Sequence, residues 1–202
     1  MGEDVDSYQT WRSTYNKGKD WEATFQRGQW NYLDEVGELP RYAVIAGYIH
    51  KLLPGGDVLD AGCGEAVFSQ YLDLERFRYT GIDLSPTAIE RAGRRLRRGT
   101  VRVSSIEEFS APAGERYCAV VFNESIQLTD TPLESIDRYR EFLTPEGLIV
   151  ISLFRTADER GNGPRLARFL VTECENGRYS LVDRCEAVSV SHSRAWEIFV
   201  LR

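Results

Sequence analysis

The chain has 202 residues, a length typical of one domain with an additional segment. Its 25 basic and 31 acidic residues give a net charge of -6, which provides no overall attraction to nucleic acid or anionic lipid. No run approaches the ~18 apolar residues of a membrane span, and the acidic first residues are unlike a signal peptide. We therefore expect a cytoplasmic protein, monomeric or homodimeric, without nucleic-acid or membrane partners.

The first part of the chain, residues 1–39, contains no strand signal but is rich in Trp and Tyr. Gly18, Gly28 and Gly37 interrupt it, and it lacks the continuous apolar stripe of a permanently docked helix. We interpret this segment as a helical lid that is mobile in the free protein. A helix is predicted for residues 40–53, because Pro54-Gly55-Gly56 stops it there.

Short apolar runs alternate with helical segments in the middle of the chain. The runs at 57–61, 79–83, 101–103, 118–122 and 148–153 are apolar on both faces, which is typical of buried parallel strands. The segments between the runs are expected to supply crossover helices, as after the N-cap Ser85, where a helix extends to about Arg97. This alternation predicts a doubly wound α/β sheet.

Three further features concern the helices and the end of the chain. Thr131 and Glu134 have the spacing of a capping box for a helix that reaches about Leu143. The arginine-rich stretch 91–102 is interpreted as a solvated helix face, not as an RNA site. Alternating runs at 179–190 and 196–201 predict an antiparallel hairpin at the sheet edge. Residues 40–202 are thus expected to form the ligand-binding domain.

The loop after the first predicted strand indicates a ligand. Asp60 precedes Gly62 and Gly64, and glycines at this point let the backbone pass close to a bound molecule. Asp83 ends the next strand, about 20 residues after Gly64, where such folds hold ribose hydroxyls. A dinucleotide loop would have glycine in place of Val67, and the Asp60 carboxylate would repel a pyrophosphate. The loop therefore favours a ligand with a ribose, a positive charge and no phosphate, and not NAD.

These segments resemble the motifs of the class I S-adenosylmethionine-dependent methyltransferases, over residues 40–202. Residues 58–66 resemble the first motif, with Ala66 in place of its usual last glycine. Residues 81–85 resemble the second motif, 104–109 the adenine-side segment and 117–127 the fourth-strand motif. The resemblance implies a Rossmann-like sheet of seven mostly parallel strands with a reversed last strand. It also implies S-adenosyl-L-methionine as cofactor, with S-adenosyl-L-homocysteine as its product. We expect no metal, because the four cysteines form no C-x-x-C pair and the chain has only two histidines.

The resemblance assigns the cofactor-binding residues. Gly62 and Gly64 would lie under the methionyl end, where Asp60 attracts an ammonium group, and Asp83 would hold both ribose hydroxyls. On these grounds Asp83→Ala should weaken cofactor binding at least tenfold with little change in stability.

The same resemblance assigns the adenine end. Leu84 and Ile106 would sandwich the adenine ring, although both are also typical core residues. Ser105 stands where many relatives have an aspartate, so we expect a weak or backbone-only contact there.

Polar residues after the fourth strand are the candidate catalytic groups. Asn123 and Glu124 would face the transferred methyl group, with Asn123 also touching the cofactor and Glu124 the acceptor. Glu124 or His192 would be the base for an oxygen acceptor. Backbone capping by the first two, and a solvated turn position for His192, are open alternatives.

The function implied by the resemblance is methyl transfer to an oxygen or nitrogen of a small molecule, as in natural-product biosynthesis. Trp11, Tyr15 and Trp30 are candidates for the acceptor pocket, with core packing as the alternative. Two other functions stay open because a fold does not determine chemistry. One is a non-methylating reaction such as a cyclisation, and the other is a cofactor-sensing or partner-binding module.

Overall fold

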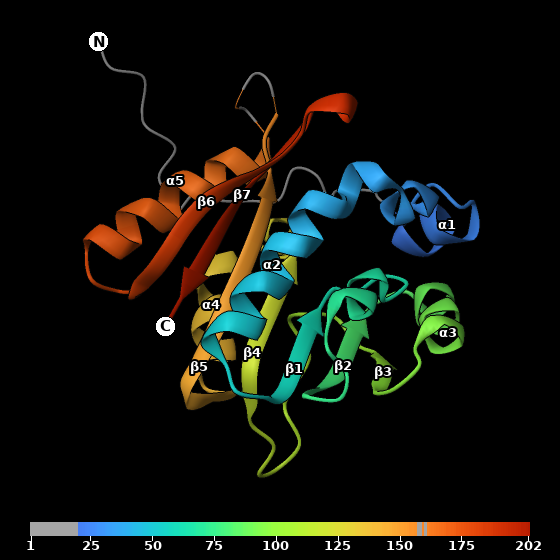
Figure 1. Cartoon of the computed structure of the whole chain (residues 1–202), viewed down its shortest axis with the longest axis horizontal. Coiled ribbons are helices and arrows are strands. Elements are labelled where there is room, and N and C mark those ends of the chain that lie inside the picture. Colours follow the sequence, from blue (N-terminus) through green and yellow to red (C-terminus); the bar gives the residue numbers. More distant parts are fainter. Residues whose placement is uncertain (1–19, 157–158, 160) are drawn as a thin grey trace.

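The structure is a computed structural model that describes residues 20–202 except 157, 158 and 160. Its centre is a seven-stranded sheet with the order β3-β2-β1-β4-β5-β7-β6 (Figure 1). The strands are β1 (Gly56–Ala61), β2 (Phe77–Asp83), β3 (Thr100–Val103), β4 (Tyr117–Asn123), β5 (Leu143–Phe154), β6 (Leu181–Ser189) and β7 (Arg194–Leu201). β7 runs antiparallel to both β5 and β6, whereas β1 to β5 pair in parallel. The predicted doubly wound sheet with a reversed last strand and a C-terminal hairpin is confirmed.

Helices cover both faces of the sheet. They are α1 (Trp21–Gln26), α2 (Leu39–Leu52), α3 (Pro86–Arg95), α4 (Pro132–Arg140) and α5 (Asn162–Glu175). The apolar residues of α4 and α5 form one core cluster with one face of the strands, and those of α2 form a second cluster with the opposite face (Figure 1). None of the helices in the described part of the chain is long and apolar enough to cross a membrane.

The predicted helix starts are confirmed, but one cap is not. α3 begins after Ser85, whose Oγ accepts the Ala88 amide at 3.1 Å, and it ends two residues before the predicted Arg97. α4 begins after Thr131, whose side chain makes no capping hydrogen bond in this described segment. The capping box predicted there is therefore wrong, and the Thr131 carbonyl instead accepts the Ser135 amide at 2.9 Å.

Two of the expected crossover helices do not form. Gly62, Gly64 and Ala66 have φ angles of 80°, 52° and 56°, which a right-handed helix cannot contain. Only the short 3-10 helix η4 (Val67–Tyr71) follows them. Between β3 and β4, the Ile106 carbonyl accepts the Tyr139 hydroxyl at 3.0 Å in place of a helical backbone bond. Left-handed residues thus interrupt the connection between β1 and β2. A side-chain contact replaces helical bonding in the connection between β3 and β4.

Candidate active site

A cavity of about 520 Å³ lies at the carboxyl ends of β1, β2 and β4. This edge is where open α/β sheets bind ligands, and the volume is typical of a small-molecule site. The cavity brings together most of the residues predicted from the sequence, namely Asp60, Gly62, Gly64, Asp83, Leu84, Ser105, Ile106, Asn123, Glu124 and Trp30. Further walls come from α1, α2 and β7, which contribute Phe25, Arg41 and Arg194.

The glycine loop is held close to the end of β4. A Cβ atom at Gly62 would lie 2.4 Å from the Ser125 Cβ, so no side chain fits there. The Ser125 hydroxyl donates to the Ala61 carbonyl at 2.5 Å, which fixes the two strand ends together. Ala66, in the position of the family's last glycine, adopts the left-handed φ of 56°. A left-handed φ is one that glycine adopts more readily than alanine, so Ala66 holds a glycine-like backbone conformation.

Asp83 connects the glycine loop to the start of α3. Its Oδ2 accepts the Gly64 amide and its Oδ1 accepts the Ser85 amide, both at 2.9 Å. Each carboxylate oxygen still has a lone pair for another donor. Burial raises the pKa of Asp83, while the amide hydrogen bonds oppose this shift. Because Asp83 also anchors the loop, the expectation that Asp83→Ala leaves stability almost unchanged no longer holds.

Asp60 is a buried carboxylate with one unused oxygen. The residue is 1% exposed, and the Tyr79 hydroxyl donates to its Oδ2 at 2.7 Å. Oδ1 has no hydrogen-bond partner among the described residues. Burial raises the pKa of Asp60 to about 7. A cationic group in the cavity would stabilise the ionised form, so this position suits an ammonium group.

The residues assigned to adenine form an apolar wall. Leu84 is 49% exposed, whereas Ile106 is 9% exposed and belongs mainly to the core. The Ser105 hydroxyl accepts the Glu108 amide at 3.1 Å and so caps its own turn. A hydroxyl engaged in this way agrees with the weak contact expected of Ser105, which stays a prediction.

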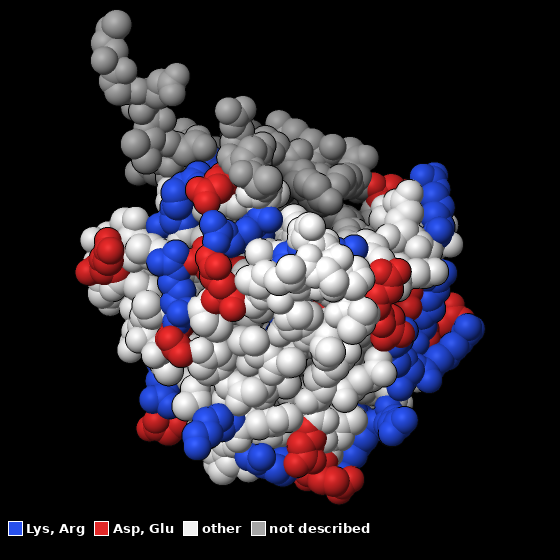
Figure 2. Space-filling view, turned by 45° about the horizontal axis from the view of Figure 1, so that its top comes forward, with Lys and Arg blue, Asp and Glu red and all other residues white. Residues whose placement is uncertain are grey.

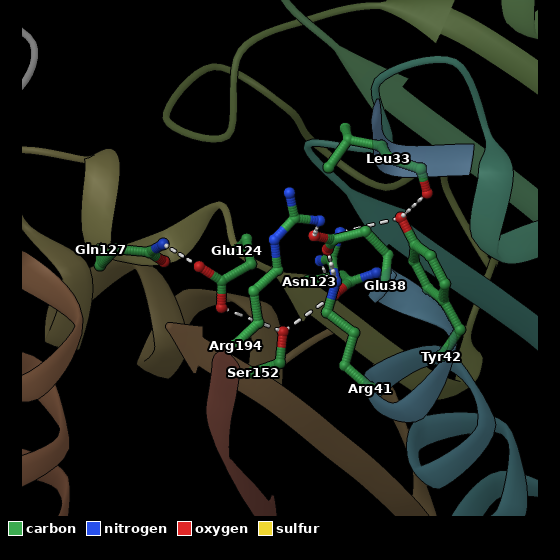
Figure 3. Close-up of polar contacts among 9 residues, drawn as sticks. All are labelled: Leu33, Glu38, Arg41, Tyr42, Asn123, Glu124, Gln127, Ser152 and Arg194. Carbon is green, nitrogen blue, oxygen red and sulfur yellow. Dashed lines mark hydrogen bonds and ion pairs between the residues drawn. The ribbon is translucent and has the colours of Figure 1, made fainter. Parts of the chain in front are cut away.

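A buried ion cluster that was not predicted borders Asn123. Arg41 is 2% exposed and donates through Nε to Glu38 at 2.7 Å and through Nη1 to the Asn123 Oδ1 at 2.6 Å (Figure 3). Arg194 donates to the other oxygen of Glu38 at 2.5 Å. The sequence carried one signal for this cluster, since Arg41 shares a helix face with the apolar Ile45 and is thus a charge on the buried stripe.

Glu124 lies beside Asn123 and has a neutral-range pKa. Its φ of 63° is left-handed, a strained conformation that tends to occur at functional sites. The Gln127 amide donates to the Glu124 Oε2 at 3.3 Å, and the Ser152 hydroxyl lies 3.3 Å from Oε1 (Figure 3). Burial raises the pKa of Glu124 to about 7, and the charge of Arg41 opposes the shift. A carboxylate with this pKa is suited to accept a proton near neutral pH.

His192 lies apart from these two residues. A Cβ at Gly37 would come within 2.7 Å of the His192 ring, so the ring packs against the backbone there. Its Nδ1 lies 2.9 Å from the Ser191 hydroxyl. His192 is not among the residues that line the cavity, whereas Arg194 of the same hairpin is. The structure therefore does not bring the predicted second base to Asn123 and Glu124.

Of the three aromatic residues predicted for the acceptor pocket, Trp30 lines the cavity. Trp11 and Tyr15 lie outside the described residues. The Trp30 ring packs against Trp21 and Phe25, with centroid separations of 6.0 and 6.2 Å. Its Nε1 is buried and has no partner in the described part of the chain. Trp30 therefore combines the two alternatives, because it packs on its neighbours and also faces the cavity.

The segment around α1 is attached to the start of α3. The Glu22 carboxylate accepts the Ser85 hydroxyl at 2.5 Å and both the amide and the hydroxyl of Thr87. These hydrogen bonds, that from Ser85 foremost, lower the pKa of Glu22 to about 2. Arg91 donates to the Phe25 carbonyl at 2.9 Å, and Arg95 pairs with Asp34.

The arginines on α3 were predicted to form a solvated helix face. Arg91 and Arg95 in addition hold the N-terminal segment.

On the surface shown in Figure 2, basic and acidic side chains are interspersed around a broad uncharged area.

Comparison with known proteins identifies relatives of this chain. A family model described as a methyltransferase domain matches residues 37–185. The ubiquinone biosynthesis O-methyltransferase of Nitrosospira multiformis is 31% identical over 112 residues, which are 52% of this chain and 47% of that protein. The 2-heptyl-1-hydroxyquinolin-4(1H)-one methyltransferase of Mycobacteroides abscessus is 36% identical over 91 residues, covering 43% and 39% of the two chains. The match thus spans less than half the length of these curated relatives.

Among solved structures, the fold is similar to that of the 1,6-didemethyltoxoflavin-N1-methyltransferase of Burkholderia thailandensis, crystallised with its substrate and S-adenosylhomocysteine. The TM-score is 0.66 at 22% identity, and the superposition covers 91% of this chain and 85% of that one. The sheet described above is therefore the Rossmann-like methyltransferase fold.

Proposed function

The chain belongs to the methyltransferase domain family, and from this premise we propose that it transfers a methyl group from S-adenosyl-L-methionine to a small-molecule oxygen or nitrogen. One observation carries the proposal. Asp60 and Asp83 end neighbouring parallel strands beside the glycine loop, and Asp60 keeps a buried oxygen without a partner among the described residues. This arrangement suits a cationic ligand with a ribose and does not suit a dinucleotide. A cytoplasmic location and a monomeric or homodimeric state belong to the same proposal.

The cavity has residues suited to the ammonium group, the ribose and the adenine ring of the cofactor. An ammonium group would satisfy the Asp60 Oδ1, and two ribose hydroxyls would use the remaining lone pairs of Asp83. The apolar surface of Leu84 is available for the adenine ring. The absent side chain at Gly62 keeps the loop close to the ligand space.

The chemistry depends mainly on positioning. When bound, S-adenosylmethionine supplies a methyl group on a positively charged sulfur. Correct orientation of the acceptor can contribute ~7 to 11 kcal/mol to lowering the barrier of such a displacement. Asn123 and Glu124 would orient the acceptor at the polar end of the cavity, while Trp30 and Phe154 line it with apolar surface that helps to exclude water. Glu124 would take the proton of an oxygen acceptor.

We expect the purified protein to bind S-adenosylmethionine and S-adenosylhomocysteine but not NAD. The physical reason is that the carboxylate of Asp60 attracts a cation and repels a pyrophosphate. Isothermal titration with the three compounds checks this, and release of S-adenosylhomocysteine with candidate acceptors checks turnover. Tight binding of NAD together with no heat of binding for S-adenosylmethionine would contradict the proposal.

The segment 1–39 is proposed to act as a lid over the cofactor. Phe25 and Trp30 line the cavity from this side, and Glu22, Phe25 and Asp34 attach the segment to α3. The attachments to α3 are hydrogen bonds and an ion pair, so we expect the segment to open at lower cost than the strands. Closing such a lid excludes water from the reacting groups.

Hydrogen exchange tests the lid. Amides of residues 21–35 should exchange faster than those of Val120 and Ile149 in the free protein, and should slow when S-adenosylhomocysteine and an acceptor bind. Glu22→Gln should accelerate exchange in 21–35 further, because it replaces the carboxylate that accepts the Ser85 and Thr87 donors. The exposed Glu90→Gln, on the same α3, is the matched control. Protection of 21–35 equal to that of the central strands in the free protein would contradict the lid.

A further inference from the structure

The orientation of the Asn123 side-chain amide is determined by its neighbours. Its Oδ1 accepts Arg41 Nη1 at 2.6 Å and the Ser152 hydroxyl at 2.8 Å. A guanidinium can only donate hydrogen bonds, so the atom that faces Arg41 must be the amide oxygen. Arg41 is itself held by Glu38 and by the Tyr42 hydroxyl, at 2.7 and 2.8 Å (Figure 3). The Nδ2 group of Asn123, which has no partner among the described residues, is left to serve the cavity as a donor.

Glu124, the next residue, supplies a hydrogen-bond acceptor where Asn123 supplies a donor. In its ionised form this carboxylate can only accept hydrogen bonds. The Gln127 amide donates to its Oε2 at 3.3 Å, while the single Ser152 hydrogen goes to the nearer Asn123 Oδ1 at 2.8 Å. The end of β4 therefore presents one donor and one proton acceptor on consecutive residues.

This pair distinguishes between two kinds of methyl acceptor. A hydroxyl oxygen has two lone pairs and one hydrogen, so it can accept from Asn123, donate to Glu124 and still direct a lone pair at the methyl group. A neutral amine nitrogen has only one lone pair. A hydrogen bond from Asn123 would occupy the lone pair that the amine needs for attack.

We propose that the Asn123–Glu124 pair selects a hydroxyl as methyl acceptor over an amine, with Arg41 as the positioning residue that sets the Asn123 amide. This inference rests on the proposed methyl transfer. In the reaction the acceptor oxygen forms a bond to the methyl carbon, the carbon–sulfur bond breaks with its electron pair going to sulfur, and the hydroxyl proton goes to Glu124. The apolar lining around Trp30, Tyr32 and Phe154 fits an acceptor with an aromatic or otherwise apolar body.

Methylation of two matched probes tests the selection without requiring the natural acceptor. The probes are 1-naphthol and 1-naphthylamine, and fluorescence titration into protein saturated with S-adenosylhomocysteine at pH 8.5 first measures their binding. Both are expected to bind, because without a methyl donor the amine can also accept from Asn123 through its lone pair. Turnover with S-adenosylmethionine should favour the naphthol by about tenfold or more, corresponding to the one hydrogen bond that the amine must give up before it attacks.

Asn123→Asp is the sharpest variant. A carboxylate there can still accept from Arg41 and Ser152, so the fold should be kept, but it offers no donor to the cavity. The preference for the naphthol should fall to about onefold or reverse. Arg41→Lys should reduce it by severalfold, because an ammonium cannot hold Asn123, Glu38 and Tyr42 in the same geometry. The exposed Arg97→Lys is the control and should leave the preference unchanged.

The outcomes separate this inference from the proposed function. Equal or faster methylation of the amine, binding of neither probe, or an unchanged preference in Asn123→Asp would overturn the selection by Asn123 and Glu124. Failure of the wild-type protein to bind S-adenosylhomocysteine would overturn the proposed function instead. Thermal melting of each variant shows whether it is folded. If Asn123→Asp is unstable, the preference of Arg41→Lys for the naphthol provides the test instead.

Discussion

Glu124→Gln is expected to lower kcat for a hydroxyl acceptor by about 100- to 10,000-fold, the usual contribution of a general base. The glutamine keeps the size and a hydrogen-bond acceptor but cannot take a proton. Binding of S-adenosylhomocysteine should change little, because Glu124 belongs to the acceptor end of the cavity. The exposed Glu141→Gln is the matched control. Equal kcat values for wild type and Glu124→Gln would contradict the assignment.

The pH dependence gives an independent check on Glu124. The pKa of this residue is raised to about 7, and a base works only in its ionised form, so kcat should rise with pH through about 7 and then level off. Arg41 stabilises the ionised carboxylate, whereas Glu38, behind Arg41, favours the protonated form. Neutralising Arg41 should therefore move the rise to higher pH. The residual kcat of Glu124→Gln is expected to be independent of pH over the same range.

The same shift affects stability. Because the folded pKa of about 7 exceeds the ordinary 4.5, the folded protein holds this proton more tightly than the unfolded chain. The stabilising contribution is complete below about pH 4.5 and is lost as the pH rises through about 7. Glu124→Gln lacks this loss, so its melting temperature should rise relative to that of the wild type between about pH 4.5 and 7.

Asp83→Ala is expected to weaken binding of S-adenosylhomocysteine at least tenfold, because charge-assisted hydrogen bonds to two ribose hydroxyls contribute ~1.5 to 3 kcal/mol each. It should also lower the melting temperature, since the Gly64 and Ser85 amides lose their acceptor. Calorimetric titration and thermal unfolding measure the two effects. The exposed Asp130→Ala, which lies outside the cavity lining, is the control. A folded variant with unaltered affinity would show that β2 does not end at the ribose.

The glycine loop and the strand ends around it were predictable because they depend on local pattern. Apolar β-branched runs identify the strands, and the strand register then brings the end of β1 next to the end of β2, where Ala61 pairs with Ile82. This register also lets the Asp83 carboxylate accept the Gly64 amide, a contact that the spacing alone did not predict. The sequence also indicated the reversed last strand through the two alternating runs of the hairpin.

The acceptor half was decided by tertiary contacts. Arg41 and Asn123 are 82 residues apart, and no local pattern pairs a charge on a helix with an amide at a strand end. The orientation of that amide, and the raised pKa of Glu124, exist only once the side chains are packed and removed from water. His192 could act chemically as a base and lies in the predicted turn. Its ring nevertheless packs against Gly37 and does not line the cavity, which the sequence did not indicate. By itself the sequence determined the strands and the glycine loop after β1, because periodicity and glycine positions act over a few residues. It also indicated Asn123 and Glu124 at the end of β4, but the orientation of the Asn123 amide and the raised pKa of Glu124 were decided by the tertiary structure, because they depend on burial and on partners distant in the chain.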